Sequence, residues 1–243
     1  MDESPSAARD PLREGHPWLR KIVAGAVISA IVLIFVYLLL EPAVRAARDT
    51  ANLGYAYGKM KDLVVSLYRY HDQHDTLPMA GGGTAPGSQL SWRVRILPML
   101  GEEALYSQFR LDEPWDSEHN RALIPKMPEA FKCRGGNFPA GQTPYLALTG
   151  PGTAFDDPEN GRSLSELTDG DSKTILLVEA DRAVEWTKPE DWQFDPGDPR
   201  RGLGTLRESG FLAGFADGRI DFIDTEAWAE KVSSMMTRAG GER

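Results

Sequence analysis

One uninterrupted apolar segment constrains this chain more than any other feature. Residues 22–40 read IVAGAVISAIVLIFVYLLL and carry no charged side chain. As an α-helix, these residues would span about 29 Å, close to the thickness of the hydrocarbon core of a bilayer. A cleaved signal peptide would have a shorter apolar stretch and a small-x-small site, for which only Ala43 to Ala47 is suggestive. We therefore expect an uncleaved transmembrane helix over 22–40, with the lipid bilayer as its partner.

The charges that flank this segment predict its orientation. Four basic residues precede it and two follow it closely: Arg9, Arg13, Arg20 and Lys21 before it, Arg45 and Arg48 after it. Positively charged flanks tend to stay in the cytoplasm. The bias favours a cytoplasmic N-terminus, with residues 1–21 as a short disordered tail, and an extracytoplasmic C-terminal domain.

Residues 41–78 predict an amphipathic continuation of the same helix. Their apolar side chains recur every three or four positions, at Leu53, Ala56, Met60, Leu63, Leu67 and Tyr70. Pro42 is expected to bend the helix. Leu77-Pro78 and a Gly/Pro-rich loop over 79–90 are expected to end it.

Residues 91–243 predict a globular α+β domain, because helical patterns come first and strand patterns later, without βαβ alternation. We expect an antiparallel sheet packed on the long helix. Helices are predicted at 91–100, at 102–109, from Asp116 as N-cap and from Thr225; strands are predicted around Cys133 and at 143–150, 173–180 and 183–187. Asp217-Gly218 predicts a hairpin with a two-residue turn.

Composition excludes several functional classes. The chain has 36 acidic and 27 basic residues, a net charge of −9, which argues against nucleic acid as a partner. Its single cysteine, Cys133, excludes internal disulfides and multi-cysteine metal sites. The sequence has no Gly-x-Ser-x-Gly, no Walker loop and no Gly-x-Gly-x-x-Gly that opens a helix. We expect no enzymatic activity and no cofactor.

Three polar clusters have both a metal-binding and a structural interpretation. His71 and His74 could share a metal, but histidines at a helix C-terminus also complement its dipole, which we favour. A second cluster of Asp112, Glu113, Asp116, Glu118 and His119 is favoured as helix capping over calcium binding. A third cluster, Asp156, Asp157, Glu159 and Asn160, is a weak candidate for a calcium loop, although the twelfth position from Asp157 is Thr168 rather than Glu.

Several segments, in an order kept throughout residues 42–224, resemble a pilin-like family known as domain-of-unknown-function family 1559. These are PAVRAAR (42–48), LYRYHDQHDTLP (67–78), SWRVRILPML (91–100), ALYSQFRLDEPWDSEHN (104–120), MPEAFKC (127–133), YLALTGPGTAF (145–155), LTDGDSKTILLVEA (167–180), VEWTKPED (184–191) and GFADGRI (214–220). The resemblance implies a long N-terminal helix packed on a sheet.

The chain departs from that family at two places. The family's prepilin-type cleavage site and the Glu at the fifth position of the apolar helix are both missing here. The family's signature His lies ten residues before the Asp of the last Asp-Gly, where this chain has Arg207. Without the Glu, packing into a filament would bury uncompensated charge, so we expect a monomeric or loosely associated anchor.

These observations predict a single-pass, membrane-anchored, pilin-like envelope protein of bacterial type. Its expected role is non-catalytic, either structural or in interaction with an envelope protein or with another copy of the chain. The alternative is an exported domain that binds a small solute or calcium.

Overall fold

The computed structural model describes residues 17–82, 89–158, 160–167, 173–207, 209–224 and 236. The chain divides into two compact units, Met1–Thr50 and Ala51–Arg243. The predicted tail over 1–21 lies mostly outside the described residues, as do the central part of the 79–90 loop and the predicted C-terminal helix from Thr225, apart from Met236.

Helix α1 runs from Pro17 to His74 and includes Pro42 in its interior. In the part of α1 that belongs to the first unit, the large apolar side chains of residues 22–40 are exposed. Leu33, for example, is 68 % exposed. It is the one helix among the described residues that is long and apolar enough to cross a membrane. The helix ends where Asp75 adopts a left-handed backbone, φ 58°, and donates its N–H to the carbonyl of His71, 2.7 Å away.

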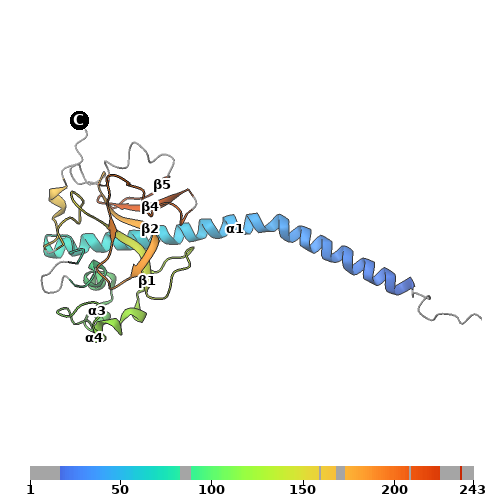
Figure 1. The fold of residues 1–243 in the computed structure, drawn as a ribbon, viewed down its shortest axis with the longest axis horizontal. Coiled ribbons are helices and arrows are strands. Elements are labelled where there is room, and N and C mark those ends of the chain that lie inside the picture. The colour runs from blue at the N-terminus through green and yellow to red at the C-terminus, as the bar shows by residue number, and fades with distance from the viewer. Residues whose placement is uncertain are drawn as a thin grey trace, which may run out of the picture. The chain divides into compact units, whose positions relative to one another are not determined.

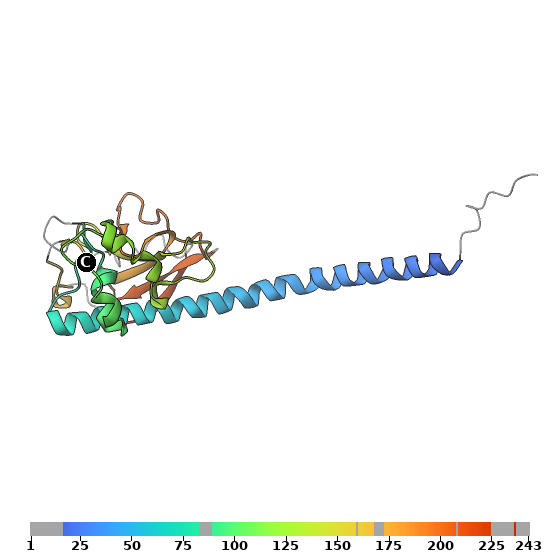
Figure 2. The same ribbon diagram turned by 90° about the horizontal axis from the view of Figure 1, so that it is seen from below.

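The second half of α1 packs on a sheet, as the amphipathic stripe predicts. Ala56, Met60, Leu63 and Leu67 are all fully buried, and Figures 1 and 2 show the last turns of α1 lying along one sheet face. The approach is close at Gly214, where an added Cβ would lie 2.7 Å from Val64 Cγ2. A glycine at this position therefore lets the helix and the sheet come together.

The sheet has five strands in the order β3-β1-β2-β4-β5: β1 is Gln142–Thr149, β2 Ile175–Glu185, β3 Trp192–Gln193, β4 Gly210–Phe215 and β5 Ile220–Asp224. All neighbours pair antiparallel except β3, which pairs parallel with the end of β1. The α+β prediction is confirmed, but the sheet is mixed rather than wholly antiparallel. The two-residue strand β3 was not predicted.

Both faces of the sheet are covered. On one face, Tyr145, Ala147, Leu177 and Leu212 share a cluster with α1. On the other, side chains such as Leu146, Val178 and Phe211 pack against a segment that follows β2 and contributes Trp192, Phe194 and Leu203. Because both faces are buried, β1 is buried at six consecutive positions rather than alternately.

The separate strands predicted at 173–180 and 183–187 form one element, β2. Its pairing with β1 nevertheless skips from Glu179 to Val184, so the intervening residues bulge out of the ladder. The bulge lies opposite Pro144, which has no N–H to donate. Asp181, within the bulge, accepts hydrogen bonds from the N–H groups of Thr205 and Leu206, both at 2.8 Å. These contacts explain why a polar interruption does not end the strand.

Several short helices precede the sheet. Ser91 caps α2, Trp92–Arg95, as predicted, and Pro98 lies at the start of the 3-10 helix Leu97–Leu100, followed by α3, Glu103–Tyr106. A fourth helix, α4, is Glu118–Arg121, and its N-cap is Ser117 rather than the predicted Asp116. Further 3-10 turns are Ile124–Lys126, Glu129–Phe131 and Leu164–Glu166.

Two further local predictions are wrong. No strand forms around Cys133, because the preceding Glu129–Phe131 coils into a 3-10 turn. The β4–β5 hairpin does form, but its loop has three residues, 216–218, closed by a hydrogen bond from the Phe215 N–H to the Arg219 carbonyl. Gly218 takes the left-handed position, φ 83°, that such a loop requires.

Candidate functional site

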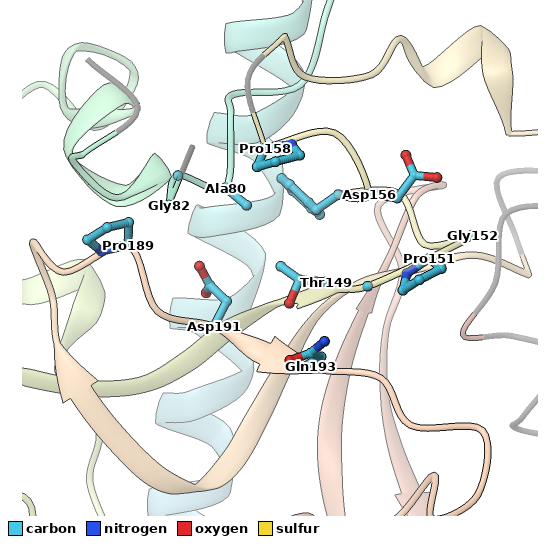
Figure 3. Close-up of a pocket in the computed structure, with 13 residues that line it drawn as sticks. Ala80, Gly82, Thr149, Pro151, Gly152, Asp156, Pro158, Pro189, Asp191 and Gln193 are labelled. Carbon is cyan, nitrogen blue, oxygen red and sulfur yellow. The ribbon is translucent and has the colours of Figure 1, made fainter. Parts of the chain in front are cut away.

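A cleft of ≈ 690 Å³ opens where three segments meet, all within the second unit. Its walls come from residues 80–82 after α1, residues 149–158 after β1, and residues 189–193 around β3. Figure 3 shows Asp191 on one side of this cleft and Asp156 on another. The size lies within the range of small-molecule sites.

Asp191 is held by a buried hydrogen-bond network. Its Oδ1 accepts hydrogen bonds from Arg93 Nη2 at 2.6 Å, from Trp92 Nε1 at 3.0 Å and from the Ala147 N–H at 2.7 Å. The side chains of Arg93 and Asp191 are 0 % and 3 % exposed. The network therefore joins α2, β1 and the segment that leads into β3.

Arg93 makes further contacts that fix its orientation. Its Nε and Nη2 both donate to the Tyr145 carbonyl, at 3.1 and 3.0 Å, and its Nη1 donates to Ser91 Oγ at 2.7 Å. Thus the serine that caps α2 also binds the guanidinium of the same helix. Each polar group of this arginine has a partner, which its burial requires.

Burial raises the pKa of Asp191 and lowers the pKa of Arg93, while their mutual attraction opposes both shifts. Three N–H groups converge on a single carboxylate oxygen, and one of them is a guanidinium. This arrangement stabilises the charged form of both side chains, so we assign them as an ion pair. Oδ2 of Asp191 is buried and has no hydrogen-bond partner in the described part of the chain.

A second buried ion pair involves Arg207, which stands where the family that the sequence resembles has its signature His. Its Nε and Nη2 donate to Glu179 Oε2 and Oε1 at 2.9 and 2.7 Å, a bidentate contact. The two side chains are 8 % and 0 % exposed. The cation at 207 thus has a structural partner on β2, in the bidentate geometry that a guanidinium forms with a carboxylate.

Cys133 lies beside this pair and is half-buried. Its thiol donates to Glu179 Oε1 at 3.4 Å. Burial raises the pKa of Cys133 from 9.0 to about 12. The negative charge of Glu179 is the next largest cause and raises the pKa as well. Because the thiolate is the reactive form, this environment makes the thiol inert.

We therefore expect slow alkylation of the folded chain. At pH 8 a pKa near 12 lowers the thiolate fraction about a thousandfold relative to a thiol with a pKa of 9.0. A more basic thiolate is also a better nucleophile, and this offsets part of the loss. The alkylation rate is therefore expected to fall about 30-fold. Iodoacetamide labelling followed by mass spectrometry measures the rate, with the urea-unfolded chain as control. Cys133 is the only cysteine, so the signal has one source. Equal rates in the two states would contradict the assignment.

The calcium candidates are bonded to other groups where the structure describes them. Asp156 Oδ1 accepts from Arg162 Nε at 2.6 Å, and Asp157 Oδ1 accepts from the Asn160 N–H at 2.9 Å. Glu159 lies outside the described residues. The part of the chain that is described contains no group of three or more His, Cys, Asp or Glu placed to hold a metal ion. Calcium binding at this loop stays a prediction.

The two histidines at the end of α1 do not face a common site. The Leu164 N–H donates to His71 Nε2 at 3.2 Å, whereas the His74 ring packs on Tyr70 with centroids 4.2 Å apart. Each therefore has a structural contact of its own. Their interpretation as residues that complement the helix dipole stays a prediction.

The cluster around Trp115 is organised by a residue that sequence reasoning missed. Asn120 is fully buried, and its Nδ2 donates to the carbonyls of Arg110, Glu113 and Pro114 at 2.9 to 3.2 Å. Glu113 pairs with Arg110 at 2.9 Å. Glu118 lies in the first turn of α4, where a negative charge is stabilising.

Sequence reasoning also did not single out Arg93 and Asp191 as a site. Both lie in segments that carried the family resemblance, SWRVRILPML and VEWTKPED. Nothing in their local sequence pattern distinguishes them from surface charges, because the two residues lie 98 positions apart in the sequence.

Comparison with known proteins gives one match. Residues 58–144 match the model of a family described as a protein of unknown function, DUF1559. Searches of curated proteins and of solved structures found no match. The matched range covers the last turns of α1, the short helices before the sheet and the start of β1, and it supports assignment of this chain to the DUF1559 family.

Proposed function

We propose that this protein is a single-pass, membrane-anchored, pilin-like envelope protein whose exported domain has a non-catalytic structural or interaction role. The observation that carries the proposal is the exposure of every large apolar side chain between Ile22 and Leu40 on an otherwise regular helix. A helix that is apolar on all sides needs lipid or protein around it. The family match and the flanking charges support the same view.

In this proposal the N-terminus is cytoplasmic and residues 51–243 fold outside the membrane. The missing acid in the apolar helix favours a monomeric or loosely associated anchor over a filament subunit. The partner is an envelope protein or a second copy of the chain.

The anchor is tested by placing charge in the apolar segment. Ile28→Arg with Phe35→Arg is expected to move the protein from the membrane pellet to the supernatant after alkaline carbonate extraction, since each arginine near the helix centre costs about 2.5–3.5 kcal/mol of insertion free energy. The matched control is Ile28→Leu with Phe35→Leu, which should stay in the pellet.

Two measurements complete this test in a bacterial host. The intact mass of the membrane-bound protein should correspond to all 243 residues, and external protease should degrade the C-terminal domain in whole cells. A shortened N-terminus would indicate a cleaved signal peptide, and protection from protease would contradict the orientation.

A second candidate function is the binding of a small solute by the exported domain. The cleft beside Asp191 favours it, because a buried carboxylate oxygen there lacks a partner among the described residues.

A further inference from the structure

The cleft contains one buried acceptor that the described part of the protein leaves unused. Asp191 Oδ1 takes all three N–H donors, while Oδ2 takes none from the described residues. A buried polar atom without a partner costs about 1–3 kcal/mol. In Figure 3 the carboxylate of Asp191 points into the space between Pro189, Gly82 and Ala80. A ligand group in that space would lie beside the Asp191 carboxylate, whose Oδ2 is almost fully buried.

The charges that line the cleft favour a positively charged ligand. Among the described lining residues the only ionisable side chains are Asp156 and Asp191, and both are acidic. Their cationic partners, Arg162 and Arg93, are not part of the lining. In a partly desolvated cleft such carboxylates attract cations more strongly than they do in water.

The remaining walls favour an organic cation over a metal ion. Beside its polar groups, the lining contains five apolar residues: Ala80, Pro151, Phe155, Pro158 and Pro189. Calcium would require six to eight oxygen ligands, and no group of three metal-binding side chains occurs in the described residues. A primary ammonium carries donors for Oδ2 and can bring an apolar group that covers the prolines.

We propose that this cleft binds a protonated primary amine attached to a short apolar group, with the ammonium donating to Asp191 Oδ2. The inference rests on the solute-binding candidate function and is independent of membrane anchoring. A small free amine and an amine on the surface of a larger molecule would present the same ammonium group. The cleft would recognise that group in either case.

The test measures thermal unfolding of the full chain in detergent micelles by tryptophan fluorescence. The probe is n-butylammonium chloride, compared at equal chloride concentration with sodium chloride. The neutral and anionic analogues are 1-butanol and sodium butyrate, and calcium chloride is a further arm. We expect a saturable rise of the unfolding temperature with butylammonium and no saturable rise with the other four.

A variant locates the binding. Gln193 is exposed and lines the cleft, so Gln193→Lys places a competing cation there without changing the buried ion pair. It should weaken butylammonium binding at least tenfold and keep the unfolding temperature of the ligand-free protein. The matched control, Gln73→Lys on the exposed surface of α1, should bind as the parent does.

The outcomes separate the proposals. Absence of saturable stabilisation by butylammonium, or equal binding in Gln193→Lys, overturns the amine site. Saturable binding of butyrate, butanol or calcium that is sensitive to Gln193→Lys also overturns it but retains solute binding at the cleft. Carbonate extraction reports on anchoring separately.

Discussion

Asp191→Ala is expected to lower the free energy of unfolding of the domain formed by residues 51–243 by about 3–5 kcal/mol. The substitution removes the anion from a guanidinium that is fully buried and leaves the N–H groups of Trp92 and Ala147 without their acceptor. The loss is large because an unpaired charge stays in the interior. Urea titration of the full chain, followed by tryptophan fluorescence, measures it.

Glu190→Ala provides the neighbouring control. Glu190 pairs with Arg182 on the surface, where both side chains are more than a third exposed. Surface pairs contribute about 0–1 kcal/mol, so this variant should resemble the parent. If Asp191→Ala were destabilised by no more than Glu190→Ala, the buried network would not have the role assigned to it.

Arg207→Met is the second substitution with a large expected effect, a loss of about 3 kcal/mol or more. The substitution leaves the fully buried carboxylate of Glu179 without its cationic partner and without the two hydrogen bonds that it accepts from Arg207. The same urea titration reports the change.

The double variant Glu179→Met with Arg207→Met distinguishes charge from packing. Replacing a whole buried ion pair by apolar side chains is often neutral or stabilising, so the double variant should be more stable than Arg207→Met alone. A double variant as unstable as the sum of the two single variants would show that the pair contributes through shape rather than charge compensation.

Local signals in the sequence predicted much of the fold. The apolar run 22–40, the stripe at Met60 and Leu67, the Ser91 cap and the hairpin around Asp217-Gly218, although not its turn length, each reflect spacing within a few residues. The errors are of a different kind. Asp116 and Ser117 are both good N-caps, so local chemistry could not choose between neighbours. Around Cys133 the sequence predicts a strand, although Pro128 leads directly into a 3-10 turn.

The candidate site depends on contacts between distant segments. β3 has only two residues, Trp192 and Gln193, and exists because it lies beside the end of β1. Arg93 and Asp191 meet only after α2 and the segment before β3 have packed on β1. Sequence periodicity contains no information about such pairing, so the cleft could not be predicted from it.

The two borders of the sheet limit how copies of this domain can associate. One border consists of β3, which is too short to template another strand, and of the rest of β1, where Arg93 and Asp191 bond the Tyr145 carbonyl and the Ala147 N–H. The other border, β5, carries Asp221 and Asp224. Short and charged edge strands of this kind disfavour backbone hydrogen bonding between the sheets of two molecules. Any assembly through these strands would therefore need side-chain recognition, in contrast to amyloid-like stacking.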